Sequence, residues 1–343
     1  MSSGTCGGGR VLLADGLVGG LIEGVRLRNG LTADLEAGAG IKVTACSNLV
    51  IRSCVIENNQ ALNTALNLGN LTGGGAYILN SYLLLTNTIF RANLSQTAYA
   101  STMSHALGGG AAILGGAAVV SDCLFIDNQL IAARNASGSG LYLAGGIQRV
   151  EHSVFTGNYS PTPQGGTAYN RGDALHVDSA ATVVTVFNSL FSANFRGAFH
   201  LENGTLSITN ATVVGHGRYG LRRVAGTLNV VNSIFWQNDQ DTLGTVGLNN
   251  SLTGVDPRFE RGLYLAGTSP AIDGGATSAA SLGLAGRTTA ADGTLDSGLA
   301  DLGYHFRAGA PFSVADDAVR FDPLVASIFV APAGNDGNRV HSQ

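Results

Sequence analysis

Lysine is almost absent from this sequence, because Lys42 is the single lysine among the 19 basic residues of a 343-residue chain. Charged residues make up 12% of the chain and the formal net charge is −4. The arginines form no basic tract, so the positive surface of a nucleic-acid-binding protein is missing, and we expect no nucleic-acid partner. Schiff-base chemistry would depend on Lys42 alone, and we do not expect it.

Long apolar runs and cysteine motifs are missing as well. No stretch reaches the 18 consecutive apolar residues that indicate a membrane-spanning helix, so we expect no transmembrane segment. The four cysteines (Cys6, Cys46, Cys54 and Cys123) lack the spacing of a zinc site. Phosphate-binding loops and the sequence motifs of serine hydrolases, zinc proteases and haem attachment are also absent.

What the chain does contain is a repeat, the tetrapeptide F-x-x-N. Its five copies are Phe90–Asn93, Phe125–Asn128, Phe155–Asn158, Phe191–Asn194 and Phe235–Asn238, and two degenerate copies are Ile56–Asn59 and Val213–His216. The closing residues follow one another at steps of 22 to 36 residues. Self-similarity at such a period indicates a solenoid, whose core grows in one dimension.

Each copy closes a short apolar segment that reads as a β-strand. Because side chains alternate along a strand, each Phe shares a face with the residue two positions before it. That earlier position holds small residues: Cys54, Thr88, Cys123, Ser153, Ser189, Ala211 and Ser233. We therefore expect a narrow interior that is filled in layers, with Cys54 and Cys123 inside it.

The closing position predicts a ladder of polar side chains. Equivalent residues of successive coils lie about 4.8 Å apart, so each amide can bond the coils above and below it. The predicted ladder contains Asn59, Asn93, Asn128, Asn158, Asn194, His216 and Asn238. A second polar row lies three residues before the Phe position, at Ser53, Asn87, Asp122, His152, Asn188, Asn210 and Asn232.

A second strand begins with glycine in every period, at about 73–79, 108–114, 138–144, 172–178, 197–202 and 219–224. Two strand segments per period, with too little chain between them for helices, predict an all-β fold, namely a parallel β-helix. The longer periods carry extra residues before this strand, at about 60–72, 94–107, 129–137 and 159–171. We expect these insertions to form a wall along one edge.

The repeated G-G-A and F-x-x-N motifs resemble the polymorphic membrane protein repeats of chlamydial autotransporter passengers, and more broadly those of exported bacterial β-helix proteins. The repeat covers about residues 7–240. Downstream, G-V-D-P-R-F-E from Gly254 and L-A-G-T-S-P-A-I-D-G-G from Leu265 resemble the segment that closes many such exported proteins. The resemblance implies a right-handed, single-stranded parallel β-helix of the pectin-lyase-like type and a secreted or cell-surface location.

These boundaries predict three parts. Residues 1–253 form the β-helix, residues 254–310 form a closing segment, and residues 311–343 form a tail that resembles the start of a further β-helix. Met1 is not followed by the charged and apolar regions of a signal peptide. We therefore expect the chain to be part of a longer exported protein.

The outward row of the glycine strand carries the chemistry-bearing residues. In register it reads Tyr77, Ala112, Tyr142, His176, His200 and Arg222, and the next outward row reads Leu79, Leu114, Ala144, Asp178, Glu202 and Val224. Three interpretations remain open: a solvated sheet face, a surface that binds a glycan or a protein, and a catalytic site. In the catalytic interpretation His176, His200, Arg222, Asp178 and Glu202 act on the substrate, and Tyr77 and Tyr142 hold sugar rings. We expect this row to face solvent, so that His200→Ala leaves the melting temperature nearly unchanged.

Two further polar motifs have competing interpretations. Asp292, Asp296 and Asp301 are separated by glycines and either place oxygens around Ca²⁺ or serve turns without a metal. No cofactor besides calcium is expected. His216–Gly217 resembles the G-H-G of polygalacturonases, but its register puts His216 on the asparagine ladder.

Two functions follow from the sequence. The first is a noncatalytic secreted or cell-surface protein with a role in adhesion, surface structure or glycan contact, whose partner is a glycan or a cell-surface protein. The second is a polysaccharide lyase or a glycoside hydrolase that acts at the outward row. A cleft over that row favours the enzyme, and a flat, open face favours the binding protein.

Overall fold

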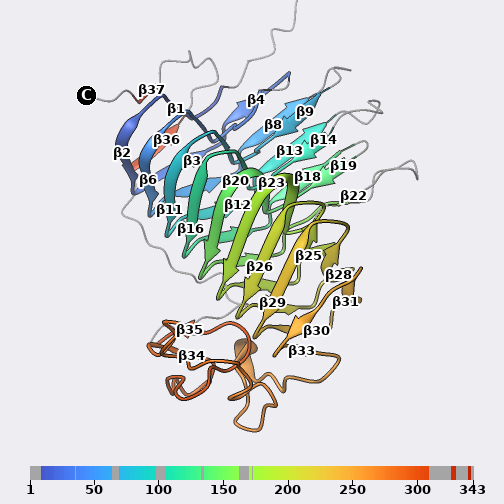
Figure 1. Cartoon of the computed structure of the whole chain (residues 1–343). Helices are drawn as coiled ribbons and strands as arrows, with labels where there is room; N and C mark the ends of the chain where they lie inside the picture. Colours follow the sequence, from blue (N-terminus) through green and yellow to red (C-terminus); the bar gives the residue numbers. More distant parts are fainter. Residues whose placement is uncertain are drawn as a thin grey trace, which may run out of the picture.

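The computed structural model describes residues 9–34, 36–63, 69–97, 105–132, 135–161, 170–171, 173–308, 326–329 and 339–340. Strands of successive coils lie side by side in chain order, from blue to yellow in Figure 1. All pairings between coils are parallel in this part of the chain, and the antiparallel pairs are confined to the closing segment. The molecule is a parallel β-helix, as predicted.

The largest sheet holds two rows of strands that run the length of the stack. The first row contains β1 (Leu12–Asp15), β5 (Ile41–Thr44), β10 (Ala76–Leu79), β15 (Ala111–Leu114), β20 (Leu141–Glu151), β23 (Leu175–Phe187), β25 (Gly197–Leu201), β28 (Tyr219–Arg223) and β31 (Gln240–Leu243). The second row contains β2 (Val18–Glu23), β6 (Ser47–Arg52), β11 (Tyr82–Thr86), β16 (Ala117–Ser121), the second halves of β20 and β23, β26 (Thr205–Thr209), β29 (Thr227–Val231) and β32 (Leu248–Asn249).

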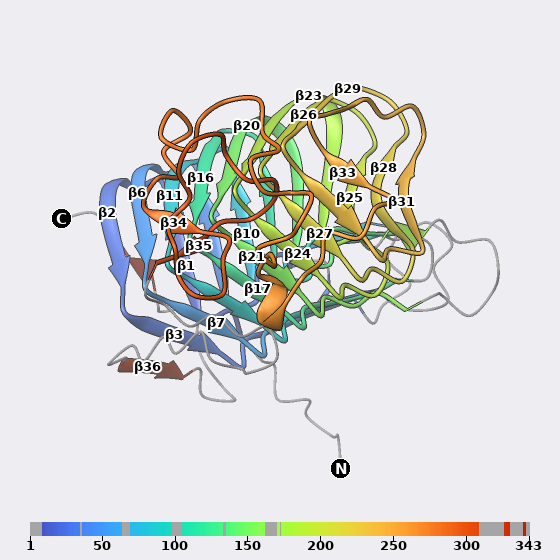
Figure 2. The same cartoon turned by 90° about the horizontal axis from the view of Figure 1, so that it is seen from below.

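A second long sheet closes each coil and carries the Phe of the repeat. It contains β3 (Val25–Arg28), β7 (Val55–Glu57), β12 (Ile89–Arg91), β17 (Leu124–Ile126), β21 (Val154–Thr156), β24 (Leu190–Ser192), β27 (Thr212–Val214), β30 (Ile234–Trp236) and β33 (Leu252–Thr253). Two short strands of the predicted tail, β36 (Ala326–Phe329) and β37 (Arg339–Val340), pair in parallel with β3 and β1 of the first coil (Figure 1). Figure 2 shows β36 beside β3. The rest of the tail lies outside the described residues. Within the described residues there is no helix long and apolar enough to cross a membrane.

The insertions form two further sheets, as the predicted wall requires. The outgoing strands are β4 (Leu31–Thr32), β8 (Gln60–Asn63), β13 (Leu94–Thr97) and β18 (Gln129–Ile131). The returning strands are β9 (Asn70–Thr72), β14 (His105–Leu107), β19 (Asn135–Ser137) and β22 (Asn170–Arg171). Small apolar residues such as Ala106, Leu130 and Ala136 are buried together in this wall. The tips of the insertions lie outside the described residues.

The asparagine ladder is present with the predicted members. The Asn59 Nδ2 group donates to Asn93 Oδ1 at 2.9 Å, and the same bond recurs from Asn93 to Asn128 at 3.0 Å and from Asn128 to Asn158 at 3.0 Å. Each amide also donates to a backbone carbonyl one coil away, as Asn128 does to Phe90 at 2.9 Å. These side chains are fully buried, and only the terminal Asn238 is half-buried. The bonds therefore satisfy groups that would otherwise be costly to desolvate.

The aromatic rings of the repeat stack inside the coils. Ring centroids of Phe90 and Phe125 are 4.7 Å apart, those of Phe125 and Phe155 are 4.5 Å apart, and those of Phe155 and Phe191 are 4.6 Å apart. The rings are nearly parallel because the strand spacing sets their separation. The small residues two positions earlier lie inside as predicted, and burial raises the pKa of the Cys123 thiol to about 12.

The second polar row lies at left-handed turns between the two long sheets. Ser53, Asn87, Asp122, His152, Asn188, Asn210 and Asn232 all have positive φ, between 41° and 53°. Asparagine and aspartate tolerate this conformation better than most residues. The row therefore marks a corner that every coil repeats.

The closing segment packs against this corner. It contains the short 3₁₀ helix η1 (Arg261–Leu263) and the antiparallel pair β34 (Arg287–Thr288) and β35 (Phe306–Arg307), and it lies below the coils in Figure 1. Asn188 Nδ2 donates to the His305 carbonyl at 2.9 Å, and the His305 amide donates back to Asn188 Oδ1 at 2.7 Å. Asn210 and Asn232 bind the same segment through Asp301 and Gly303. The closing segment therefore runs alongside the solenoid.

Removing one rung tests the ladder. We expect Asn128→Ala to lower the free energy of unfolding by about 2–4 kcal/mol, because it leaves buried donors and acceptors of three coils without partners. Denaturant titration measures the loss. The control Asn229→Ala makes the same change at an exposed strand position and should cost about 0.5 kcal/mol or less. Equal losses in the two variants would contradict a stabilising ladder.

Candidate functional site

The predicted outward row has the predicted register but not the predicted exposure. Tyr142 pairs with His176, His176 with His200, and His200 with Arg222. The prediction that the row faces solvent is wrong at its centre, because His176 is 1% exposed and His200 is 0% exposed. Tyr142 is buried as well.

The insertion wall explains this burial. Its returning strands come back beside the outer face of the first row of strands, and Leu107 of β14 packs against Ala112 and Tyr142. Arg171 of β22, at the end of the fourth insertion, reaches the Glu202 carboxylate at 2.7 Å. The centre of the row, Tyr142, His176 and His200, therefore lies in a buried interface between the coils and the wall, which we call the seam.

Four charged side chains, Asp173, His200, Glu202 and Arg171, form an ion network in the seam. His200 Nδ1 lies 3.1 Å from Asp173 Oδ2, and His200 Nε2 lies 3.0 Å from Glu202 Oε2. Arg171 pairs with the same Glu202 oxygen. Because carboxylates face both ring nitrogens, His200 donates to both of them as a cation, which gives the charged side chains opposite partners.

The pKa values of the two stacked histidines are driven apart. Burial alone would lower the pKa of His200, but its hydrogen bonds to Asp173 and Glu202 raise it above the ordinary value. Burial, together with the positive charge of His200 and of the nearby arginines, holds the pKa of His176 well below its usual range. The hydrogen bond from His200, and then the charge of Arg171, lower the pKa of Glu202.

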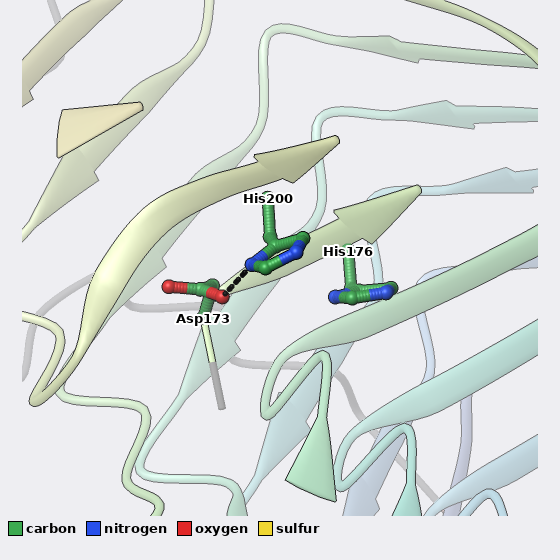
Figure 3. Close-up of side chains that lie close together, drawn as sticks. All are labelled: Asp173, His176 and His200. Atoms are coloured by element: carbon green, nitrogen blue, oxygen red, sulfur yellow. Dashed lines mark hydrogen bonds and ion pairs between the residues drawn. The ribbon is translucent and has the colours of Figure 1, made fainter. Parts of the chain in front are cut away.

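His176 stacks on His200 but makes no hydrogen bond to this ion network through its Nδ1 atom. Its ring stacks on that of His200 with centroids 4.6 Å apart, and on that of Tyr142 at 5.5 Å. Its Nδ1 atom is buried and has no hydrogen-bond partner among the described residues. Figure 3 shows His176 beside His200 and Asp173, with the bond between the last two dashed.

The remaining predicted site residues lie apart from this group. Asp178 accepts a hydrogen bond from the Tyr142 hydroxyl at 3.0 Å, and burial followed by the Asp178 charge raises the pKa of Tyr142. The Arg222 guanidinium donates to the Tyr219 hydroxyl at 3.5 Å. Tyr77 packs in the same apolar cluster as Tyr142, and burial raises the pKa of Tyr77. The five predicted catalytic residues therefore do not converge on one point.

Asp173 and Arg171 belong to the site but were not predicted. Asp173 occupies the position that Gly74, Gly109 and Ser139 hold in the preceding coils, as the backbone bonds between these coils show. A carboxylate at a position that is otherwise glycine or serine was the available signal. A β-carbon on Gly197 would lie 2.5 Å from Asp173 Oδ1, so that glycine makes room for the carboxylate.

The three aspartates proposed for calcium are not brought together as a binding group. Asp292 is exposed and accepts a bond from the Thr294 amide at 2.9 Å. Asp296 Oδ2 lies 2.7 Å from His305 Nε2 and accepts the Asp301 amide at 3.0 Å. The Asp301 carboxylate accepts the Asp273 amide at 2.8 Å. These carboxylates hold the closing segment together, which matches the interpretation as turn residues.

His216 lies on the asparagine ladder, as its register predicts. The Asn194 amide donates to His216 Nδ1 at 3.2 Å, and the His216 amide donates to Asn238 Oδ1 at 3.1 Å. Burial lowers the pKa of His216 to about 4. The residue is thus a neutral rung.

Among the described residues, one set of histidine, cysteine and carboxylate side chains has ligand atoms that all lie within 4.8 Å of one another: Asp173, His176 and His200. The seam therefore suits an internal ion network or a bound cation. Its burial leaves no room for a polymer chain at the imidazoles. Comparisons with models of known protein families, with curated proteins and with solved structures gave no match.

Burial of the seam reverses the expectation for His200→Ala. We now expect this change to lower the free energy of unfolding by roughly 3–5 kcal/mol, because it leaves the Asp173 and Glu202 charges without their shared partner. Denaturant titration at neutral pH provides the measurement. Thr227→Ala, at an exposed position of the same sheet, is the control. A loss no larger than that of the control would contradict the ion network.

The His216 rung predicts a specific acid sensitivity. Its pKa is about 4 in the folded chain against an ordinary 6.5, so the unfolded chain takes up the proton first as the pH falls. Stability from this residue is complete above pH 6.5 and declines by about 3 kcal/mol between pH 6.5 and 4. His216→Asn, which keeps an amide rung, should lose correspondingly less stability over that range. If the free energy of unfolding of both chains fell equally between pH 6.5 and 4, the assignment of His216 as a neutral side chain of the ladder would be contradicted.

Proposed function

We propose that this protein is a noncatalytic, exported β-helix that binds another protein through the open outer face of its second strand row. The observation that carries this proposal is a strip of exposed apolar side chains on that face. The exposed members of the strip are Leu21, Tyr82, Leu84, Ile147 and Val183, and the half-buried Val50, Ala117 and Val119 lie between them in the same two rows.

The apolar strip is confined to part of the stack. Its two rows continue into later coils as Arg149, Thr185, Ser207 and Asn229, and as Thr205 and Thr227. Those later residues are typical of a solvated sheet face. Since the coils have the same backbone architecture, folding does not require apolar residues in the earlier ones.

The strip is accessible and hollowed. Ile147 is 66% exposed and Tyr82 is 58% exposed. An open hollow of about 580 Å³ lies over β6, β11, β16 and β20, and Tyr82, Leu84, Val119 and Ile147 are among the side chains that line it. Along one edge, Arg52 pairs with Glu23 at 2.6 Å and Arg149 pairs with Glu151 at 2.6 Å. An apolar centre with a polar rim is the usual anatomy of a protein–protein interface.

The chemistry of the hollow favours a protein over a glycan. Its lining is largely aliphatic, and its polar side chains are Asn48 and Arg149, with the Tyr82 hydroxyl as a third polar group. A sugar would leave most of its hydroxyls facing aliphatic groups without partners. Apolar side chains from a protein surface would bury this area favourably, at roughly 25 cal/mol per Å² before the costs of association.

The exported, surface-located setting rests on the repeat itself. The G-G-A and F-x-x-N motifs that resemble autotransporter passengers coincide with the glycine strand and the asparagine ladder of each coil. A long, rigid stack with few charges suits a passenger that holds a binding face away from a cell. Catalysis by a polysaccharide lyase or a glycoside hydrolase is disfavoured, because the imidazoles of the outward row are buried.

A phage-displayed peptide library selected on the whole chain tests the proposal. We expect enrichment of peptides with leucine and aromatic residues, since these match an aliphatic hollow. The double variant Leu84→Glu/Ile147→Glu should weaken their binding by at least about tenfold. The matched control Thr227→Glu/Asn229→Glu places the same charges on the polar continuation of the same two rows and should leave binding unchanged.

Three results would contradict this function. The selected peptides could bind the strip variant as well as the unchanged chain, or the chain could self-associate through the strip. A panel of acidic and neutral polysaccharides, incubated with and without Ca²⁺, provides the third. Unsaturated products or new reducing ends that disappear in His200→Ala would assign the protein to the lyase or hydrolase class.

A further inference from the structure

The buried seam brings three potential metal ligands together from two successive coils. Asp173 follows β22, His176 lies in β23 and His200 lies in β25. Their ligand atoms all lie within 4.8 Å of one another, and all three residues are at most 1% exposed. Figure 3 shows the three side chains grouped together.

Two atoms of this group have unused bonding capacity. Asp173 Oδ1 and His176 Nδ1 are buried and lack hydrogen-bond partners among the described residues. A buried polar atom without a partner typically costs about 1–3 kcal/mol, so native structures keep few of them. A cation between the three side chains would give His176 Nδ1 a partner.

The surroundings of His200 match those of a metal-binding histidine. His200 Nε2 lies 3.0 Å from Glu202 Oε2, and Arg171 holds the same carboxylate at 2.7 Å. In metalloproteins a ligating imidazole almost always donates its second ring N–H to a carboxylate or a carbonyl, which orients the ring. The Glu202 contact leaves His200 Nδ1 directed at Asp173, from which it is 3.1 Å distant.

The kind of donor atom selects the kind of ion. Two imidazole nitrogens and one carboxylate suit zinc and its first-row neighbours, whereas calcium and magnesium prefer sites built from oxygen. We propose that Asp173, His176 and His200 bind one divalent transition-metal ion of the zinc class. The ion would take the place of the Asp173–His200 hydrogen bond and would leave a fourth coordination position for another ligand.

Such an ion would fasten the wall to the coils. Asp173 follows the last strand of the fourth insertion, and the two histidines belong to adjacent coils. A ligand that binds the folded chain and not the unfolded one adds to stability in proportion to the logarithm of its concentration. The inference does not depend on the proposed protein-binding function.

Metal titration of the full chain tests the site. After chelator treatment and dialysis, the chain is titrated with ZnCl₂ by calorimetry and with CoCl₂ by visible absorption, and CaCl₂ serves as the oxygen-preferring comparison. We expect about one Zn²⁺ per chain, a higher melting temperature with Zn²⁺, and Co²⁺ ligand-field bands. CaCl₂ should produce none of these changes.

Variants locate the ion. Asp173→Asn and His176→Phe should each weaken Zn²⁺ binding by at least about tenfold and remove the Co²⁺ bands, with folding verified by circular dichroism. His216→Asn, a buried histidine outside the group, should bind like the unchanged chain. Failure of the folded, unchanged chain to take up one Zn²⁺ overturns the proposal even if the variants do not fold. Equal uptake by folded Asp173→Asn and the unchanged chain overturns it as well.

Discussion

The spacing between parallel strands is the constraint on which the rest of this structure depends. Each residue of a coil lies about 4.8 Å from its equivalent in the next coil, so the side chain that suits a position in one coil must stack on its neighbour. Phenyl rings and carboxamides satisfy this condition, because they stack in parallel or bond head to tail. Long charged side chains of one sign do not, which agrees with the low content of charged residues.

The same constraint explains why the seam is unusual. Stacked imidazoles cannot both be charged at this distance in a buried setting, so one of them is a cation between two carboxylates and the other is neutral. The coil that contains Asp173 therefore departs from the glycine and serine of its equivalents. On the outer face of the second strand row no buried charges impose such a balance, and apolar residues are exposed to solvent there.

The sequence allowed the fold and its ladders to be predicted because these features are local and periodic. Phe125 and Asn128 have equivalents at the same place in the neighbouring coils, and the pairing register follows from counting residues. The burial of His200 could not be predicted in this way, because it depends on where an aperiodic insertion returns. Register gave the neighbours of His200 within the sheet. It did not give the contact with Asp173, a residue that departs from the repeat, or the approach of Arg171 from the wall. The contact between Asp296 and His305 could not be predicted for a similar reason, since His305 follows an irregular loop.

The closing segment has a consequence for how the solenoid unfolds. In a simple stack each coil contacts its immediate neighbours, so the terminal coil can detach first and the others can follow one at a time. Here one segment binds Asn188, Asn210 and Asn232, which belong to three successive coils, and Arg307 lies 3.1 Å from Asp122, further along the stack. Detaching the last coil therefore requires releasing a segment that also holds the earlier ones. The closing segment therefore couples the unfolding of the last coils into one cooperative step. The cooperative unit at that end includes more than neighbouring coils.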